Sequence, residues 1–405
     1  MKPTIYLALT HDWELRGDGS GDIEQIQFAP MRELLRIYKE YGIRTTFHPD
    51  VTQQLSFRKF TGQTAALKSQ ADQWDEHLRK AFRLGHDIQL HIHPQWWTAN
   101  YKGGKWQLSD DWSILDYDPD STLAMLTQSK DYLETLLQKL DSSYRCLAFR
   151  AGALAIAPSS HLLRLLARLG IVLDVSVAPG LKVDTTHVQF DYRSCEGRFL
   201  PFYPRMDDAR RISDRPEGII CVPIHCFYGS RLQVLKWHFQ FLARMTKQRL
   251  GSQKKEREMP ADVYANRHWR EASHSSLLQL LYHKVFIPYL TGNYLVSNTA
   301  RLNYPLLREM LASIRRHAQA SGKPAVPAVI TNHPKEIRSF TSFERFIRET
   351  SQADDIKFIT LTEMARKLLK QELPVTCQRA DTMTRYSVSE YSYFSSSNTQ
   401  TADKR

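Results

Sequence analysis

The chain has 405 residues, of which 42% are hydrophobic, and can therefore bury a large core, either as one (β/α) barrel with additions or as two ordinary domains. Its net charge of +12 favours anionic partners such as phosphorylated sugars, lipid head groups or nucleic acid, without choosing among them. No apolar run reaches transmembrane length, and the first one, over 5–9, is too short for a signal peptide, so we expect a soluble, cytoplasmic protein.

The first part of the chain alternates apolar strands with amphipathic helices. The apolar run over 4–10 is typical of a parallel strand covered on both faces, and it leads into Asp12 and Glu14. Pro30 opens a helix that Gly42 ends. A strand over 44–47 follows and reaches His48. A helix over 73–84 returns to a third strand, which completes a βαβαβ order.

The third strand carries two histidines on one face. Over 88–93, apolar residues alternate with polar ones, and a period of two predicts an extended strand with two different faces. His91 and His93 therefore point the same way. Pro94 cannot donate to a ladder and ends the strand, so both imidazoles should lie at its carboxyl end.

The second part continues the alternation and then changes character. Helices are predicted over 122–140 and from Pro158, and strands over 146–149, 171–177 and 218–225. Short strands near 188–192 and 199–203 look like additions. The segment 230–290 reads as a helical insertion whose basic cluster, 244–257, could contact an anionic membrane peripherally.

The last ordered units are a helix over 304–318, a strand over 328–331 that reaches His333, and a short strand and helix over 358–369. Residues 380–405 are polar and without periodicity, and we expect a disordered tail. Residues 1–379 should then form one α/β domain, a distorted (β/α) barrel of about seven strands that includes the insertion.

Chemically capable side chains recur where the predicted strands end. In a barrel these carboxyl ends share one rim, so residues far apart in sequence should converge there. The residues are Asp12, Glu14, His48, His91, His93, Arg150 and His333. Of the seven, His48 is held only as a reserve ligand.

Four short motifs resemble those of one family. THDWE at 10–14, GHDI at 85–88 leading to His91, FRAG at 149–152 and TNHP at 331–334 are similar to the first, second, third and last motifs of the polysaccharide deacetylases (NodB homology family). The resemblance covers about residues 4–370. It implies a distorted seven-stranded (β/α) barrel that binds a divalent metal, usually zinc, and hydrolyses an N-acetyl or O-acetyl group on a sugar.

The resemblance also implies roles for individual residues. Asp12 would be a carboxylate of the site and a metal ligand, His91 a metal ligand, Arg150 the residue that orients the catalytic carboxylate, and His333 the general acid. The family commonly has adjacent aspartates in its first motif, whereas here Trp13 follows Asp12. Glu14 is the nearest substitute, and which of the two carboxylates is base and which is ligand stays open.

The second departure concerns the metal-binding histidines. The family's second histidine commonly lies four residues after the first, a position that Gln95 occupies here, so His93 is the candidate second imidazole. Two imidazoles and one carboxylate suit zinc, which would lower the pKa of a bound water toward about 7. Trp96 and Trp97 could stack on sugar rings, although core packing explains them nearly as well.

Three functional hypotheses follow. The leading one is a metal-dependent deacetylase that acts on an acetylated sugar or glycolipid precursor for a surface polysaccharide. The alternative is a catalytically inactive barrel that binds glycan or a biosynthetic partner. Nucleic-acid binding is not expected, because no recognised motif accompanies the basic segment. Five cysteines at irregular spacing predict no disulfide framework, and Cys221 and Cys226 read as buried apolar residues rather than zinc ligands.

Overall fold

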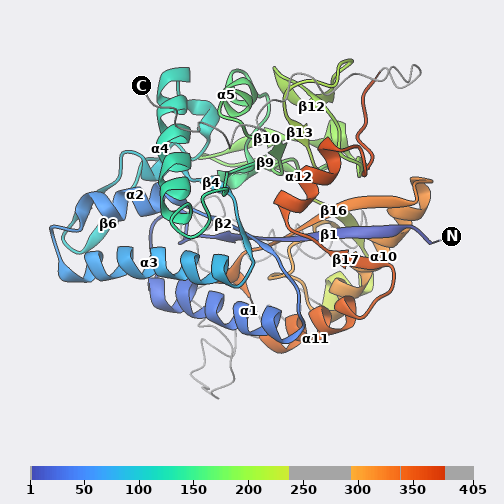
Figure 1. Ribbon diagram of the computed structural model, residues 1–405, viewed down its shortest axis with the longest axis horizontal. Helices are drawn as coiled ribbons and strands as arrows, with labels where there is room; N and C mark the ends of the chain where they lie inside the picture. The colour runs from blue at the N-terminus through green and yellow to red at the C-terminus, as the bar shows by residue number, and fades with distance from the viewer. Residues whose placement is uncertain (1, 237–292, 338, 379–405) are drawn as a thin grey trace, which may run out of the picture.

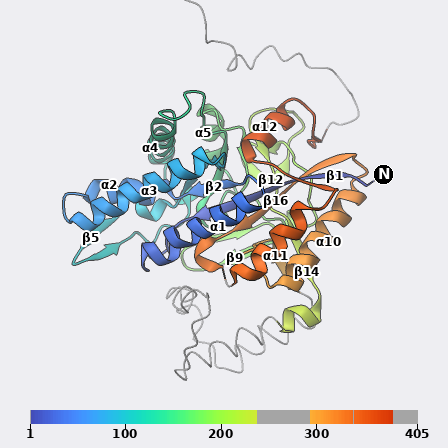
Figure 2. The ribbon, with the colours of Figure 1, turned by 60° about the horizontal axis from the view of Figure 1, so that its bottom comes forward.

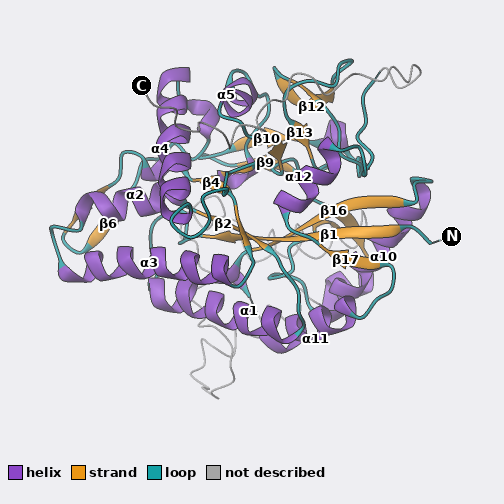
Figure 3. Ribbon diagram, viewed as in Figure 1, coloured by secondary structure: helices purple, strands orange, loops and turns teal. Residues whose placement is uncertain are grey.

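Parallel β-sheets form the centre of the structure, and helices pack around them (Figures 1 and 3). The computed structural model describes residues 2–236, 293–337 and 339–378. In the first sheet the strand order is β16-β1-β2-β3, and β17 also pairs with β1. These strands are β1 (Thr4–Trp13), β2 (Thr46–Pro49), β3 (Asp87–Ile88), β16 (Ala325–Asn332) and β17 (Ile356–Phe358).

The second sheet is also parallel and has the order β13-β8-β7-β4. Its strands are β4 (Leu90–Ile92), β7 (Ala148–Ala151), β8 (Leu173–Asp174) and β13 (Ile220–Cys221). Four two-stranded antiparallel sheets are added to this framework: β5 (Asn100–Lys102) with β6 (Lys105–Gln107), β9 (Lys182–Asp184) with β10 (Gln189–Asp191), β11 (Pro204–Arg205) with β12 (Asp208–Ile212), and β14 (Cys226–Gly229) with β15 (Asn293–Val296).

The two parallel sheets meet at two seams. At the first, β3 and β4 are separated only by Gln89, whose side-chain oxygen accepts the main-chain N–H groups of Leu147 and Ala148 at 2.8 and 2.7 Å. At the second, Ile224 forms a single parallel bridge with Val329 of β16. Pro223 precedes that bridge and has no N–H to donate, which interrupts the ladder.

The prediction of an α/β fold with parallel strands is therefore confirmed. The predicted distorted barrel of about seven strands is not confirmed, because in the described part of the chain the strands form two sheets that touch at seams. At the first seam the side chain of Gln89 takes the place of main-chain hydrogen bonds between strands, and at the second Pro223 cannot donate one. The regular main-chain hydrogen bonds that a closed barrel requires are therefore missing at both seams.

The helices cover the sheets on their outer faces, as Figure 2 shows for α1, α3 and α11. They are α1 (Ala29–Glu40), α2 (Val51–Phe60), α3 (Ala65–Arg83), α4 (Pro119–Leu137), α5 (Leu162–Arg168), α10 (Tyr304–Ala320), α11 (Phe340–Ser351) and α12 (Leu361–Leu369). Short turns of other helix types include η1 (Glu24–Phe28), η2 (Pro94–Trp96), η3 (Ile114–Asp116), η4 (Gly152–Leu154), η5 (Arg193–Cys195) and η8 (Pro334–Glu336). The sequence predicted α1, α4 and α10 closely, but α2 and α11 were not predicted.

Strand β1 has two apolar faces because it is covered on both sides. Leu7, Leu9 and Trp13 belong to the larger core cluster, which reaches the outer helices, whereas Ala8 belongs to a second cluster together with Val329. The alternation places Asp12 on the face of Ala8 rather than on the face of Trp13. The carboxyl end of β1 thus presents its acidic side chain to the space between the sheets.

Two predictions fall mainly outside the described residues. The helical insertion over 230–290, with its basic cluster 244–257, lies there apart from residues 230–236, and so does the tail over 380–405. Within the described ranges, no helix combines the length and apolar character needed to cross a membrane.

Candidate functional site

Six polar side chains meet at the carboxyl ends of four parallel strands. They are Asp12 and Glu14 on or just after β1, His91 and His93 on or just after β4, Arg150 on β7, and His333 just after β16. Their side chains form two groups that share the strand end of β1. One group is built around Glu14 and the other around Asp12.

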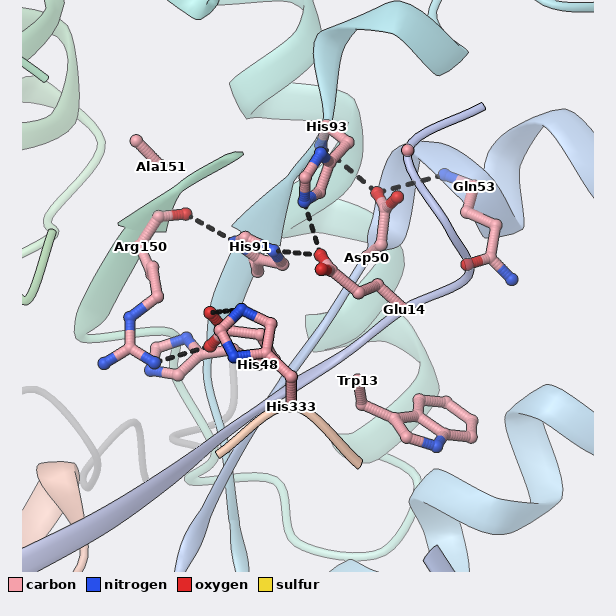
Figure 4. Close-up of polar contacts among 12 residues, drawn as sticks. Trp13, Glu14, His48, Asp50, Gln53, His91, His93, Arg150, Ala151 and His333 are labelled. Carbon is pink, nitrogen blue, oxygen red and sulfur yellow. Dashed lines mark hydrogen bonds and ion pairs between the residues drawn. The ribbon is translucent and has the colours of Figure 1, made fainter. Parts of the chain in front are cut away.

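The first group joins Glu14 to both histidines. Oε2 of Glu14 lies 2.9 Å from Nε2 of His91 and also contacts Nε2 of His93. Figure 4 shows both imidazoles pointing at this carboxylate from the same strand. Among the described residues this is the one cluster of three whose ligand atoms all lie within 4.8 Å of one another, and all three side chains are buried.

Each histidine is oriented by hydrogen bonds behind it. Nδ1 of His91 lies 2.8 Å from the carbonyl oxygen of Arg150, so it is the N–H donor and Nε2 keeps its lone pair for a ligand. The main-chain N–H of His93 donates to Asp50 Oδ1 and Thr52 Oγ1 at 3.2 and 3.0 Å. Asp50 is the N-cap residue of α2, and its side chain also accepts the main-chain N–H of Gln53.

Gly152 leaves the space that the ring of His93 occupies. A Cβ at position 152 would lie 2.7 Å from the carbonyl oxygen of Ile92 and 3.1 Å from Nδ1 of His93. The glycine of the third motif therefore has a steric reason: any side chain there would push the imidazole out of place.

Glu14 is held from the other side by a lysine. Nζ of Lys335 lies 2.8 Å from Oε1 of Glu14 and donates to the carbonyl oxygen of Leu15 at 2.7 Å. Burial raises the pKa of Glu14, but His93 and Lys335 oppose this and the pKa is lowered well below its usual value. Burial tends to lower the pKa of His91, whereas the hydrogen bond to Glu14 raises it, and the pKa is raised overall.

These residues fit a divalent metal. Two imidazole nitrogens and an ionised carboxylate are ligands that zinc accepts, and a three-residue set leaves a position for water or substrate. The hydrogen bond behind His91 is the kind of outer contact that metal-binding histidines make.

The second group is a buried ion pair with a histidine beside it. Nη1 of Arg150 lies 2.5 Å from Oδ1 of Asp12, and Nε2 of His333 lies 3.3 Å from Oδ2. Nε of Arg150 donates to the carbonyl oxygen of Val175 at 3.1 Å, which fixes the guanidinium. Burial raises the pKa of Asp12, but Arg150 and His333 outweigh it and the pKa is lowered. Asp12 is therefore ionised at neutral pH.

His333 is oriented by Asn298. The amide oxygen of Asn298 accepts the main-chain N–H of Ala300 at 3.1 Å, which identifies Nδ2 as the donor that lies 3.0 Å from Nδ1 of His333. With Nδ1 accepting, the ring proton is on Nε2 and points toward Asp12. Burial lowers the pKa of His333, while the charges of Asp12 and Glu336 act in the opposite direction.

The geometry separates the two carboxylates of the first motif. Asp12 is not part of the three-residue cluster that could hold a metal, because Arg150 and His333 occupy its two oxygens. The prediction of Asp12 as a ligand beside His91 and His93 is therefore replaced by Glu14 in the proposal below. Trp13 points away from Glu14 (Figure 4) and donates to the carbonyl oxygen of Gln27 at 2.8 Å.

The reserve ligand His48 is buried on β2 but is not in that cluster. Its Nδ1 lies 3.3 Å from the carbonyl oxygen of Leu90, and burial lowers its pKa well below the usual value. Cys221 lies in the interior, where its thiol donates to Asp174 at 3.4 Å.

The predicted sugar platform is not supported for Trp96. Its side chain is 1% exposed and packs edge-on against Phe57 and Trp106, so core packing is its role in the structure. Trp97 is only partly buried and stays a prediction. Gln95, at the family's second histidine position, contacts Nδ1 of His93 at 3.2 Å instead of Glu14.

Sequence reasoning missed Lys335 and Asn298. Lys335 follows His333 and Pro334 directly, so its closeness to the last motif was a usable signal. Asn298 lies outside all four motifs and just after β15, a short strand that the sequence did not predict. Nothing in the pattern around it indicated its contact with His333.

Comparisons with known proteins find similarity in structure only. No family model matches the chain, and no curated protein matches its sequence. Solved structures with a similar fold include a candidate polysaccharide deacetylase from Mycobacterium smegmatis, with 15% identity, 96% of each chain covered and a TM-score of 0.47. Polysaccharide deacetylases are thus among the solved structures that resemble this fold.

Two further structures show the range of these similarities. A candidate polysaccharide deacetylase from Pseudomonas aeruginosa PAO1 is 12% identical, with 91% of each chain covered and a TM-score of 0.42. A 4-alpha-glucanotransferase from Thermococcus litoralis is 14% identical over 91% of this chain and 41% of its own, with a TM-score of 0.45.

Proposed function

We propose that this protein is a metal-dependent hydrolase that removes an acetyl group from an acetylated carbohydrate. One observation carries the proposal: a carboxylate-histidine-histidine cluster and a separate carboxylate-arginine-histidine group meet at one strand end. Both groups arise from the four motifs that resemble the polysaccharide deacetylases. A divalent metal and an acid-base pair are the two parts that hydrolysis of an amide or ester by water requires.

Glu14, His91 and His93 would hold the metal, zinc being the proposed ion. When bound, such an ion polarises a carbonyl group and lowers the pKa of water. Lys335 keeps the Oε1 atom of Glu14 occupied, which leaves Oε2 as its ligand atom. The main-chain oxygen of Arg150 holds the N–H of His91 so that its other nitrogen faces the site.

Asp12 and His333 would move the protons. Asp12 is ionised and can take a proton from the attacking water, and Arg150 keeps it charged and aligned. His333 would protonate the departing amine or alcohol from Nε2, the nitrogen that faces Asp12, after the ring has taken up a second proton, so that a neutral imidazole is left. The products are acetate and the free amine or hydroxyl of the sugar. Acid and base contributions of this kind are typically worth about 10²–10⁴-fold each.

The test combines metal content with product release. Protein treated with a chelator and reloaded with zinc is assayed for acetate released from N-acetylglucosamine oligomers and from O-acetylated sugars. His91→Ala should lose both metal and activity, whereas Asp12→Asn should keep the metal and lose activity. His161→Ala and Asp131→Asn, which lie outside the site, are the matched controls. Metal retention in His91→Ala, or full activity in Asp12→Asn, would refute the assignment.

A catalytically inactive glycan-binding protein is the second candidate. Its support is the altered first motif, in which Trp13 follows Asp12 where the polysaccharide deacetylases commonly have a second aspartate. Glycan binding by protein that takes up no zinc and releases no acetate from any substrate would favour this candidate.

We propose an acetylated sugar or glycolipid precursor of a surface polysaccharide as the substrate class. We place the reaction in the cytoplasm because all five cysteines are free, as expected in a reducing compartment. Fractionation of the native source would test the location.

A further inference from the structure

A cavity bordered by arginines lies apart from the candidate site. It has a volume of about 610 Å³, in the range of small-molecule sites, and none of its lining residues belongs to the two groups described above. Its arginines are Arg198, Arg205, Arg210 and Arg211. Most of them come from the hairpin of β11 and β12, which Figure 1 shows at the upper margin of the molecule, beside β13.

The positive charge of the lining is only partly compensated. Asp208 is the one acidic residue of the lining, and Arg210 engages both of its oxygens at 2.8 and 2.9 Å. Arg211 reaches the same carboxylate only at 3.9 Å, and its side chain is 64% exposed. Arg205 is paired with Asp207, at 2.9 Å. Two further guanidinium groups therefore face the cavity without a close carboxylate of their own, those of Arg198 and Arg211.

Arg198 is fixed in place by neutral groups. Its Nη1 donates to the carbonyl oxygen of Arg210 at 2.8 Å and lies 3.5 Å from the sulfur of Cys195. Its guanidinium carbon lies 4.5 Å from the centre of the Phe202 ring. These contacts hold the group in one orientation while leaving its charge uncompensated, so little conformational entropy remains to be lost when an anion binds.

The rest of the lining adds polar groups. Ser194 supplies a hydroxyl and Gln378 an amide. The main-chain N–H of Gln378 donates to the carbonyl oxygen of Ser213 at 2.9 Å, which fixes that segment beside β12. A guanidinium group can donate two parallel N–H···O hydrogen bonds to a phosphate, and hydroxyl and amide groups can supply further hydrogen bonds to it.

We propose that this cavity binds a free phosphorylated small molecule, with Arg198 and Arg211 as the main phosphate contacts. A concave site suits a ligand that enters it, whereas a lipid surface would need a protruding or flat basic patch. The inference is independent of the metal chemistry proposed above, because the two sites share no residue.

The experiment is calorimetric titration of the full-length chain with pyrophosphate. The protein is treated with a chelator beforehand, so that a bound metal cannot capture the phosphate. The wild type should bind one pyrophosphate per chain. Arg198→Gln/Arg211→Gln should weaken binding by more than about tenfold, because each lost contact is a charge-assisted hydrogen bond.

Arg36→Gln/Arg83→Gln is the matched control, since it removes the same charge from two arginines paired with carboxylates on α1 and α3. Its affinity should stay within about twofold, because screened distant charges contribute little. If the double variant does not fold, the single variant Arg211→Gln tests the proposal instead. It should fold, because the side chain of Arg211 is exposed and makes little packing contact. It should weaken binding by about fivefold or more.

Several outcomes would overturn the proposal. They include no pyrophosphate binding by the wild type, an equal loss in the control pair, and binding only to vesicles that contain phosphatidic acid. The last would assign the arginines to a membrane headgroup instead of a free ligand. Pyrophosphate affinity that is unchanged in the control pair and weakened in both cavity variants supports the proposal, and unchanged affinity in the cavity variants contradicts it.

Discussion

The buried ion pair between Arg150 and Asp12 allows a quantitative prediction. Arg150 is fully buried, and the side chain of Asp12 is 3% exposed. Arg150→Met keeps the aliphatic part of the side chain but removes the guanidinium group that pairs with the carboxylate. Removal of one member of a buried pair typically costs about 3–5 kcal/mol. We expect the free energy of unfolding to fall by about 4 kcal/mol at pH 7, part of it from the lost bond to Val175.

The double variant Asp12→Asn/Arg150→Met tests the cause. With the negative charge removed as well, about 2 kcal/mol should be regained, because no uncompensated charge is left in the interior. The deficit of the single variant should also depend on pH. The lowered pKa of Asp12 gives the wild type a stability contribution that is present above about pH 4 and is lost as pH falls below that value.

Urea unfolding of chelator-treated protein, followed by circular dichroism at pH 7 and pH 4, measures these quantities. The difference between wild type and Arg150→Met should be largest at pH 7 and smaller at pH 4, where Asp12 in the variant is protonated. A loss below about 1 kcal/mol at pH 7 would put this pair in the range of exposed salt bridges and contradict the reasoning. So would a double variant no more stable than the single one.

Three further predictions concern single residues. Gly152→Ala should weaken zinc binding by about tenfold or more because it displaces His93, whereas Gly62→Ala, with no atom within 4 Å, should not change a zinc competition titration. Asp174→Asn should stabilise the protein at pH 7. Burial raises the pKa of Asp174 in the folded protein to about 6, so the wild type loses about 2–3 kcal/mol of its free energy of unfolding as the pH rises from about 4 to 6. Urea unfolding of wild type and variant at pH 4 and pH 7 measures the difference. Lys335→Gln should lower the kcat of acetate release at saturating metal, because Oε1 of Glu14 loses its charged partner. An unchanged kcat would limit Lys335 to a structural role.

The sequence predicted those parts of the fold that strong local patterns specify. The apolar run over 4–10 became β1, although the strand continues to Trp13, because β2 pairs with its last residues. Helix α2 was missed because its apolar residues follow no clear stripe, and its stability comes from Asp50 at its N-terminus and from packing on α3. The division into two sheets could not be predicted either, since it depends on contacts between residues about a hundred positions apart, such as the bridge between Ile224 and Val329.

The candidate site was likewise predictable only in part. Residue types at strand ends were readable, and the structure brings Asp12, Glu14, His91 and Arg150 together. The partition between the two carboxylates was not readable, because it depends on which oxygen Arg150 reaches from β7 and which Lys335 reaches from after β16. Both partners are more than a hundred residues away in sequence.

Both departures from the family motifs share one geometric explanation. In an extended chain, residues two apart face the same side and neighbours face opposite sides. Glu14 therefore joins Asp12 at the site while Trp13 turns into the helical layer, where it packs 5.3 Å from Trp74 between ring centres. His93 is likewise two residues from His91, on a segment that stays extended until η2 begins at Pro94.

In this chain the two carboxylates, Asp12 and Glu14, and the two histidines, His91 and His93, are each two residues apart. The polysaccharide deacetylases commonly have adjacent carboxylates and histidines four residues apart. Because the carboxylate and the imidazole that changed position contact each other, each substitution supplies the partner that the other needs. The resulting carboxylate-histidine-histidine cluster is the group that we propose to hold the metal. Restoring only the histidine spacing of four, as in Gln95→His, should therefore not raise zinc affinity, since position 95 faces His93 and Gly17 and not Glu14. A zinc competition titration in which Gln95→His binds more tightly than the wild type would contradict the assignment of His93 as the second imidazole ligand.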